Sequence, residues 1–257
     1  HSVPLLKLRE FQDLGHEIIF LIGDFTATVG DPTGKSVTRP ALTDEEVEAN
    51  MKSYVKQAGM ILDLDKTEIR HNSEWFRKMS AAEFYSLARI NTLSDLLNRS
   101  MIKERMEKDE SVTLSEMIYP VLQAYDSVML KADIEIGGLD QIFNMLHGRK
   151  IQEKFNQAPQ QVMTFELLIG LDGKNKMSKS LNNYIGLTED PESQFGKIMS
   201  LPDEFIFEYF TLVTRLSREE IDSIKSLKPR DAKARLGWEI VKMYHGEDKA
   251  TKAQSEF

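Results

Sequence analysis

The stretch PLLKLREFQDLGHEIIFLIG, residues 4–23, joins a helical pattern directly to a strand pattern. Pro4 suits the first turn of a helix, apolar residues follow at helical spacing, and Gly15 supplies a stop. Residues 17–23 then form an apolar run typical of a strand that is buried on both faces of a parallel sheet. A helix followed directly by such a strand is half of a parallel α/β repeat. This stretch therefore predicts an α/β fold.

The remaining pattern continues this alternation as far as residue 190. Further strands are predicted at 68–72, at 132–136 before two glycines, and at 163–168, with helices at 44–62, 75–89, 92–107, 112–130 and 140–155. Pro120 lacks an amide hydrogen and is expected to kink its helix. Beyond residue 190 only helices are predicted, at 191–199, 204–212, 218–226 and 231–244. We therefore expect an α/β domain over residues 1–190 and a small α-helical domain over 191–257.

The composition excludes several classes of protein. With 257 residues, of which 41% are hydrophobic, the chain can fill one large domain and a smaller one. Its 33 basic and 41 acidic residues give a net charge of −8, which argues against a surface-wide grip on nucleic acid. The absence of cysteine excludes disulfides and thiolate metal ligands, and it fits a reducing cytosol. No apolar run approaches the roughly 20 residues of a membrane span.

Residues 176–180, Lys-Met-Ser-Lys-Ser, place two ammonium groups three residues apart. Gly170 and Gly173 precede this pentapeptide and Asn182-Asn183 follow it, which favours a mobile loop over a rigid helix. Such a loop can close two cations over a phosphate. A solvated lysine loop is the alternative for the Lys-x-x-Lys spacing taken alone.

A second Gly-rich stretch, residues 23–36, is predicted to be a loop but does not fit a P-loop. A P-loop needs a Gly followed by four residues before Gly-Lys-Ser, and the position five before Gly34 is Val29. The chain after Ser36 also runs into Pro40, so no helix can begin there to offer its amides to a phosphate. A P-loop kinase or NTPase is therefore disfavoured.

Two further sets of residues suit a small polar ligand. Tyr119, Gln123 and Asp126 are spaced i, i+4, i+7, so they share one face of the predicted helix. The run GGLDQ, residues 137–141, follows a strand at the edge where ligands bind in parallel sheets. A solvent-facing stripe and an ordinary tight turn are the respective alternatives.

Four motifs occur together in the order shown by one enzyme family: Gly-Asp-Pro-Thr-Gly-Lys (30–35), Tyr-x-x-x-Gln-Ala-Tyr-Asp (119–126), Gly-Gly-x-Asp-Gln (137–141) and Lys-Met-Ser-Lys-Ser (176–180). With them the chain closely resembles the tyrosyl-tRNA synthetases, which are class I aminoacyl-tRNA synthetases, over nearly its whole length. It is similar to the bacterial branch that keeps the full lysine pentapeptide. Tryptophanyl-tRNA synthetases share the fold and the pentapeptide, but the polar residues of 119–126 match the tyrosine enzyme.

The resemblance implies a Rossmann-like catalytic domain over residues 1–190, followed by the α-helical domain. It also implies how the amino acid is held. Tyr119, Gln123 and Asp31 would receive the tyrosine ammonium. Asp126 would accept a hydrogen bond from the phenol hydroxyl, and Gln141 would lie near the tyrosine carboxylate. Each role fits the chemistry of the residue, since an ammonium needs acceptors and a carboxylate can read a hydroxyl.

A second set of residues would contact ATP. Asp140, beside two glycines, would hold a ribose hydroxyl, and His1 would contact a phosphate. The lysine and arginine side chains of the set would hold the departing pyrophosphate. In chain order the implied ATP and pyrophosphate ligands are His1, Lys35, Arg39, Gly137, Gly138, Asp140, Lys176 and Lys179.

The implied reaction is the activation of L-tyrosine by ATP to tyrosyl-adenylate, followed by transfer to tRNA(Tyr). No covalent enzyme intermediate is required, and catalysis would rest on positioning and charge stabilisation. Mg²⁺ would accompany ATP without a dedicated protein metal site. A cytoplasmic homodimer is implied, and the apolar residues between Thr92 and Met106 are expected to form part of its two-fold interface.

The chain also departs from the family pattern. It opens on His1 without an initiator Met, so we expect it to start inside a larger gene product. His1 would be the last residue of a His-x-Gly-His motif whose first residues, with the preceding strand, are not in the chain. The RNA-binding domain that usually follows the helical domain is not in it either. The resemblance leaves open whether this stretch is active alone, and a non-catalytic RNA-binding relative is a further, disfavoured alternative.

Overall fold

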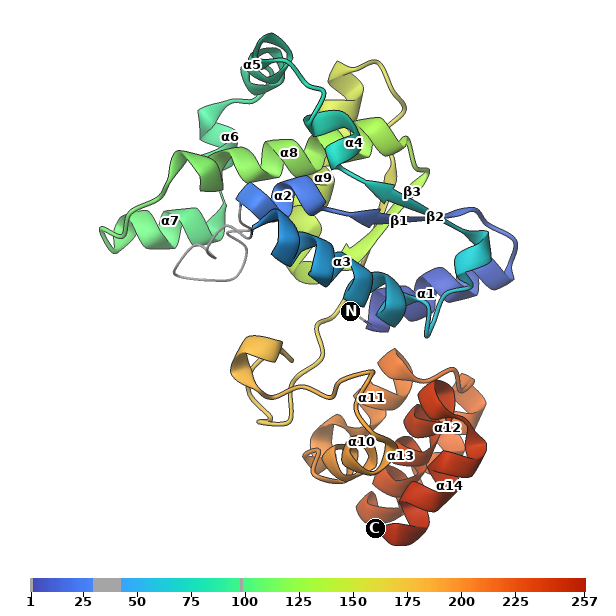
Figure 1. Cartoon of the computed structure of the whole chain (residues 1–257). Coiled ribbons are helices and arrows are strands. Elements are labelled where there is room, and N and C mark those ends of the chain that lie inside the picture. The colour runs from blue at the N-terminus through green and yellow to red at the C-terminus, as the bar shows by residue number, and fades with distance from the viewer. Residues whose placement is uncertain (1, 30–42, 98) are drawn as a thin grey trace. The chain divides into compact units, whose positions relative to one another are not determined.

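The structure is a computed structural model that describes residues 2–29, 43–97 and 99–257 (Figure 1). Four strands and a larger number of helices are present in this part of the chain. The elements are α1 (Ser2–Asp13), β1 (Ile18–Ile22), α2 (Asp24–Val29), α3 (Asp44–Ala58), η1 (Leu64–Lys66), β2 (Thr67–His71), α4 (Ser73–Phe76), α5 (Ala81–Arg89), α6 (Leu93–Leu97), α7 (Ser100–Glu107), α8 (Leu114–Leu130), β3 (Ile134–Gly138), η2 (Leu139–Gln141), α9 (Ile142–Lys154), β4 (Gln161–Phe165), η3 (Lys179–Leu181), α10 (Pro191–Met199), η4 (Asp203–Phe205), α11 (Ile206–Val213), α12 (Arg218–Ile224), α13 (Pro229–His245) and α14 (Glu247–Glu256).

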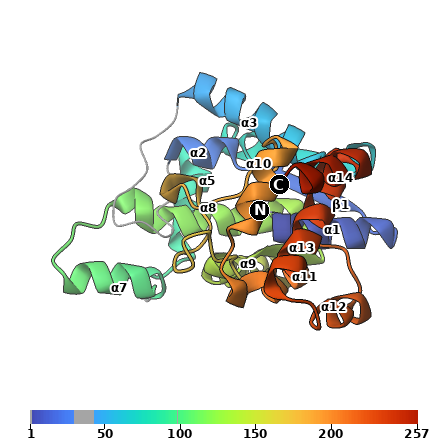
Figure 2. The same ribbon diagram turned by 90° about the horizontal axis from the view of Figure 1, so that it is seen from below.

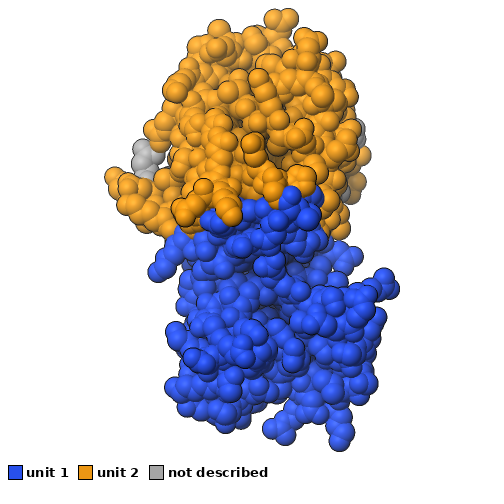
Figure 3. Space-filling model, turned by 90° about the vertical axis from the view of Figure 1, so that its right-hand side faces the viewer, with its two compact units in different colours: residues 1–14, 56–63, 166–257 blue, residues 15–55, 64–165 orange. Residues whose placement is uncertain are grey.

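The chain forms two compact units, which Figure 3 colours separately. Unit 1 comprises residues 1–14, 56–63 and 166–257, and unit 2 comprises residues 15–55 and 64–165. These units do not coincide with the expected boundary at residue 190, because the lysine loop and the first helix belong to unit 1. The functional division into a catalytic domain over 1–190 and a helical domain over 191–257 stays a prediction.

Unit 2 contains the strands, and all of its strand pairs are parallel. β1 pairs with β2 from Ile18 opposite Thr67, and β3 pairs with β4 from Ile134 opposite Gln161. Helices alternate with these strands along the chain, so the predicted α/β class is confirmed. The first strand is less buried than expected: Ile18 and Ile22 are buried, while the three residues between them are only partly so.

Helices α8 and α9 pack against each other in unit 2 (Figure 1). A hydrophobic core forms along α8 and includes Met117, Val121, Ala124 and Val128, together with Ile102 from α7. Leu122, on another face of α8, packs with two aromatic residues of α4. Burial on several faces fixes the rotation of α8, and with it the direction of its polar face. α8 continues through Pro120 as one helix.

Three expectations about unit 2 are wrong in detail. Residues 24–29, expected to be loop, form helix α2. The helix expected at 75–89 is two helices, because Ser80 and Glu83 form a capping box that starts α5. The helix expected at 92–107 is also two, α6 and α7, since Arg99 has an extended backbone.

Arg99 shows why the second break occurs. Its guanidinium donates to the carbonyl of Glu116 at 3.4 Å and lies 5.4 Å from the ring centre of Phe143. In α7, Arg105 forms a buried ion pair of 2.5 Å with Glu116. These contacts with α8 and α9 outweigh the local helical preference of residues 92–107.

Unit 1 contains the C-terminal helices, among which α10, α13 and α14 pack together (Figure 2). Phe195, Val241, Ala250 and Ala253 form their common core. The four helices expected beyond residue 190 are present, and α14 was not expected. In the same unit, α1 ends as predicted: Gly15, just beyond it, has a φ of +90°. No helix in the described ranges is long and apolar enough to cross a membrane.

Candidate functional site

The polar face of α8 is set on a rigid helix of unit 2. Thr113 and Glu116 form a capping box at its start, and the helix then runs without interruption past Tyr119, Gln123 and Asp126. The three residues therefore share a face, as their spacing predicts. Asp126 is only 6% exposed, so the face is not a solvated stripe.

Asp126 is held by two side chains of the segment that follows β2. Trp75 Nε1 donates to Asp126 Oδ1 at 2.9 Å, and Asn72 Nδ2 donates to Asp126 Oδ2 at 3.3 Å. Burial raises the pKa of Asp126 from 3.8 to about 8, although both hydrogen bonds oppose this shift. The negative charges of Glu135 and Asp24 add to the increase. A carboxyl group with unused lone pairs in such a place is suited to binding a hydroxyl group.

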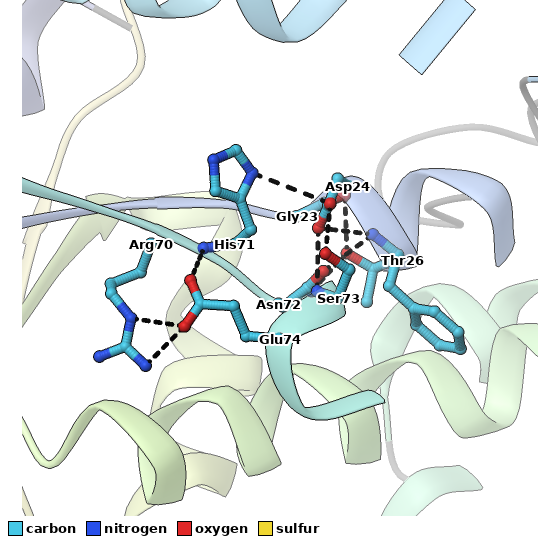
Figure 4. A network of polar contacts seen from close by, with 9 residues as sticks. Gly23, Asp24, Thr26, Arg70, His71, Asn72, Ser73 and Glu74 are labelled. Carbon is cyan, nitrogen blue, oxygen red and sulfur yellow. Dashed lines mark hydrogen bonds and ion pairs between the residues drawn. The ribbon is translucent and has the colours of Figure 1, made fainter. Parts of the chain in front are cut away.

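Asn72 is itself fixed by an exchange of caps between two β–α connections (Figure 4). Asn72 Oδ1 accepts from the amide of Phe25 at 2.9 Å, at the start of α2. Asp24 Oδ1 accepts from the amide of Ser73 at 2.9 Å, at the start of α4. Asn72, which follows β2, thus caps α2, and Asp24, which comes after β1, caps α4. Because Asn72 Oδ1 is used in this exchange, the contacts of Asn72 with Thr26 and Asp126 are made by Nδ2, which donates to Thr26 Oγ1 and to Asp126 Oδ2.

The same network places a serine, an aspartate and a histidine near one another (Figure 4). Ser73 Oγ donates to Asp24 Oδ2 at 2.6 Å, and His71 Nδ1 lies 3.8 Å from that oxygen. The aspartate lies between the other two, whereas a nucleophile relay needs the histidine in the middle. The arrangement is therefore structural, and it joins the carboxyl ends of β1 and β2.

Asn144 connects the second set of predicted residues to α8. Its Nδ2 donates to Gln123 Oε1 at 2.8 Å and to Gln141 Oε1 at 3.0 Å. Asn144 is 2% exposed, and its buried Oδ1 has no hydrogen bond with the residues the structure describes. One amide group therefore sets the orientation of both glutamine side chains.

The GGLDQ run lies where the sequence predicts it, at the carboxyl end of a strand. Gly137 and Gly138 are the last residues of β3 and pair with Thr164 and Phe165, so they are not a tight turn. The next three residues form η2, in which Asp140 is exposed. A Cβ at Gly137 would lie 3.0 Å from the sulfur of Met145, so the glycine permits α9 to pack closely against β3.

The lysine loop belongs to unit 1 and is a loop, as predicted, apart from the single turn η3. An isolated antiparallel bridge joins Ile169 to Lys176 at its base. Hydrogen bonds from Asn175 and from the amide of Lys174 hold the pKa of Asp172 well below its usual range. Lys176 and Lys179 are both exposed. Lys179 makes no ion pair with any residue in the described ranges.

The predicted site residues thus fall into three groups. In unit 2, the structure brings Gln123 and Gln141 together through Asn144, while Asp126 contacts Asn72 and Trp75. Lys176 and Lys179 lie in unit 1. Tyr119, Gly137, Gly138 and Asp140 also belong to unit 2. His1, Asp31, Lys35 and Arg39 lie outside the described residues. Within the described ranges, no group of three or more His, Asp or Glu residues could hold a metal ion.

Sequence reasoning missed the residues that support the predicted ones: Asn72, Trp75, Asn144 and also Asn183, whose Oδ1 accepts from the amide of Ser178 in the lysine loop. It treated Asn72 as the end of a strand and Asn183 as a loop former. A usable signal existed only for Asn144, which lies three residues after Gln141 at helical spacing. The partners of Asp126 come from more than 50 residues away, and no local pattern points to them.

The family model described as tRNA synthetases class I (W and Y) matches residues 1–257. The chain therefore belongs to the class I tRNA synthetases, in the family of the tryptophan and tyrosine enzymes. Among its relatives, the tyrosine--tRNA ligase of Idiomarina loihiensis is 51% identical over 262 residues, which cover 100% of this chain and 65% of the relative. The tyrosine--tRNA ligase of Thermotoga maritima is 48% identical over 263 residues, which cover 100% of this chain and 66% of the relative. The chain thus spans slightly less than two thirds of these relatives.

Two solved structures show the same fold. A C-terminally truncated mitochondrial tyrosyl-tRNA synthetase of Aspergillus nidulans has a TM-score of 0.80 at 24% identity, with 100% of this chain and 80% of that chain covered. The tyrosyl-tRNA synthetase of Archaeoglobus fulgidus in complex with L-tyrosine has a TM-score of 0.73 at 24% identity, with 99% of this chain and 85% of that chain covered. The Rossmann-like α/β class expected from the sequence is confirmed.

Proposed function

We propose that the full-length protein activates L-tyrosine with ATP to tyrosyl-adenylate and transfers the tyrosyl group to tRNA(Tyr). The observation that carries this proposal is Asp126: a buried carboxyl group, held by Asn72 and Trp75, on the same face of α8 as Gln123. A tyrosine whose ammonium lies near Gln123 and Tyr119 can extend its ring along the helix toward Asp126. Relatives named tyrosine--tRNA ligase that are 51% and 48% identical support the same substrate.

In the first step a carboxylate oxygen of tyrosine forms a bond to the α-phosphorus of ATP. The bond from this phosphorus to the bridging oxygen breaks, and pyrophosphate leaves with its electron pair. Lys176 and Lys179, with Lys35 and Arg39, would stabilise the charge that develops on the leaving group. Mg²⁺ bound to the ATP phosphates would supply additional positive charge there.

In the second step a ribose hydroxyl of the tRNA attacks the tyrosyl carbonyl, and AMP leaves. Asp140 and the glycine backbone of β3 would hold the ribose of the adenylate, and His1 would contact phosphate. No side chain needs to form a covalent bond. The chain's own contribution is positioning and electrostatic stabilisation.

Tyrosine-dependent exchange of pyrophosphate into ATP by the full-length protein tests the proposal. We expect exchange with tyrosine and little with phenylalanine or tryptophan. Tryptophan is the informative control, since the family includes the tryptophan enzymes. Exchange that depends on tryptophan, or no exchange with any of the three, would refute the assignment.

We also propose a cytoplasmic homodimer. Leu93 of α6, Met106 of α7 and Leu114 of α8 are 64%, 52% and 74% exposed, so this part of unit 2 offers apolar side chains to a second copy. Leu96, in the same stretch, is buried in the core of unit 2 and contributes nothing to such a surface. Light scattering at micromolar concentration should give the dimer mass, and a monomer would refute it.

A further inference from the structure

The loop that carries the two lysines is closed at its base by backbone hydrogen bonds. The amide of Met177 donates to the carbonyl of Leu168 at 2.7 Å, and the amide of Leu171 donates to the carbonyl of Asn183 at 2.9 Å. Tyr209, from α11, donates its hydroxyl to the carbonyl of Ile169. The two ends of the loop are therefore anchored, and the segment between the lysines is held by backbone hydrogen bonding at Met177.

The side chain of Asn183 adds contacts to the residues on both sides of Met177. Its Oδ1 accepts from the amide of Ser178 at 2.8 Å. Its Nδ2 donates to the carbonyl of Lys176 at 3.2 Å and to Asp172 Oδ2 at 3.1 Å. The side-chain amide of Asn183 thus binds the carbonyl of the residue before Met177 and the amide of the residue after it. Asn183 therefore contacts the backbone of Lys176 directly, and that of Ser178, the residue before Lys179.

The burial of Asn183 makes these bonds significant. Asn183 is 4% exposed, and it packs against Gly170 so closely that a Cβ there would lie 2.2 Å from Asn183 Nδ2. A buried amide whose donors and acceptor are all used resists opening, because each group would lose its partner. The glycine at 170 is required for this contact rather than for chain flexibility.

We propose that Asn183 is a positioning residue of the lysine loop: its side-chain amide fixes the backbone from Lys176 to Ser178 and so sets the positions from which Lys176 and Lys179 extend. The contacts stand independently of any activity. Their value for catalysis rests on the proposed function, in which both lysines hold the departing pyrophosphate.

Limited trypsin digestion tests the structural part of this proposal, because trypsin cleaves after lysine only where the backbone can open. The full-length protein and its Asn183→Ala variant are digested, and cleavage after Lys176 and Lys179 is followed by mass spectrometry. Cleavage after Lys131, in unit 2, is the internal reference. We expect cleavage in the loop to become at least about tenfold faster relative to the reference.

Asn182→Gly is the matched control. Asn182 is exposed and has a φ of 51°, a conformation that glycine adopts without strain. This variant should be cleaved at the wild-type rate. Equal cleavage of Asn183→Ala and wild type would overturn the proposal. So would an increase of the same size after Lys131, because Asn183 would then only support global stability.

Asn183→Asp separates hydrogen bonding from packing. The variant keeps the shape and the acceptor for Ser178, but it places a carboxylate oxygen against Asp172 Oδ2 and the carbonyl of Lys176. We expect loop cleavage at least as fast as in Asn183→Ala. Wild-type cleavage of the aspartate variant would show that only side-chain volume matters at this position, and would overturn the proposal.

Pyrophosphate exchange by the same variants tests the link to catalysis. Asn183→Ala should lower kcat by about 10- to 100-fold and leave the KM for tyrosine within about twofold, because the misplaced cations act mainly when charge develops. A raised KM with unchanged kcat would overturn the catalytic role. If the wild-type protein shows no tyrosine-dependent exchange, the proposed function fails, while the trypsin result still decides how the loop is held.

Discussion

Asp126 is 6% exposed and both of its oxygens accept hydrogen bonds, whereas Lys179 is exposed and has no ionic partner in the described part of the chain. The first region is preorganised in a core of helices, and the second extends from a loop that is held by hydrogen bonds to its backbone and to Asp172. The difference indicates that the two regions contribute to the proposed reaction in different ways. Buried groups with fixed partners discriminate between ligands already in the ground state, while mobile cations contribute most where charge develops.

The largest effect is expected for Asp126→Ala. Loss of the carboxyl group removes the proposed partner of the phenol hydroxyl, and it takes the hydrogen-bond acceptor away from Asn72 and Trp75. We expect kcat/KM for tyrosine to fall by about 100- to 1,000-fold and kcat/KM for phenylalanine to fall much less. Pyrophosphate exchange with both amino acids measures this, with the exposed Asp133→Ala as control. An unchanged ratio of the two values would show that Asp126 does not read the hydroxyl.

A second test of the buried region is the pH dependence of stability without ligand. The raised pKa of Asp126 means that its stabilising contribution is complete below the unfolded-state pKa near 3.8 and is lost as the pH rises toward about 8. The free energy of unfolding of the wild type should therefore fall over this range. Asp126→Asn lacks the titrating group, so its free energy of unfolding should fall less, and the difference between the two proteins should reach up to about 4 kcal/mol between pH 5 and pH 8. Urea unfolding at several pH values measures the difference, and parallel curves would contradict it.

For the exposed region we expect Lys179→Ala to lower kcat by about 10- to 100-fold while the KM for tyrosine stays within about twofold. Lys174→Ala, on the same loop, is the control and should behave as wild type. The free energy of unfolding should change by less than about 0.5 kcal/mol in both, because exposed lysines contribute little to stability. A raised KM with unchanged kcat would place Lys179 with the residues that bind tyrosine.

The smallest effect is expected for Asn144→Ala, which frees the two glutamines without removing either. The KM for tyrosine should rise by about tenfold, with kcat less affected. A double-mutant cycle with Gln123→Ala checks the mechanism, since residues that act through each other give non-additive effects. Strictly additive losses would mean that Asn144 acts on stability alone.

The fold class and the polar face of α8 could be predicted because both follow from short-range spacing. The break before α5 was also readable, from the Ser80–Glu83 capping box. The break at Arg99 was not, because it results from contacts with α8 and α9. α14 lacks a large apolar stripe and buries only Ala250 and Ala253, so periodicity alone does not reveal it.

The residues of the candidate site also divide into those that short-range spacing predicts and those that it does not. Residue types at fixed spacing predicted Gln123, Asp126 and the lysine loop, and their roles stay predictions. The residues that hold them, Asn72, Trp75 and Asn183, carry amide or indole groups with no distinctive local spacing. Their function arises from where the chain folds back, which a single sequence does not specify.

The exchange of caps between Asp24 and Asn72 also constrains the order of folding. The two contacts join residues 47 and 49 positions apart, so neither can form until the intervening segment, including α3 and β2, has closed as a loop. Contacts of such sequence separation form slowly compared with helical turns. The contact between Asn72 and Asp126 spans 54 residues, so by the same argument the surroundings of Asp126 are completed after the local helical turns have formed.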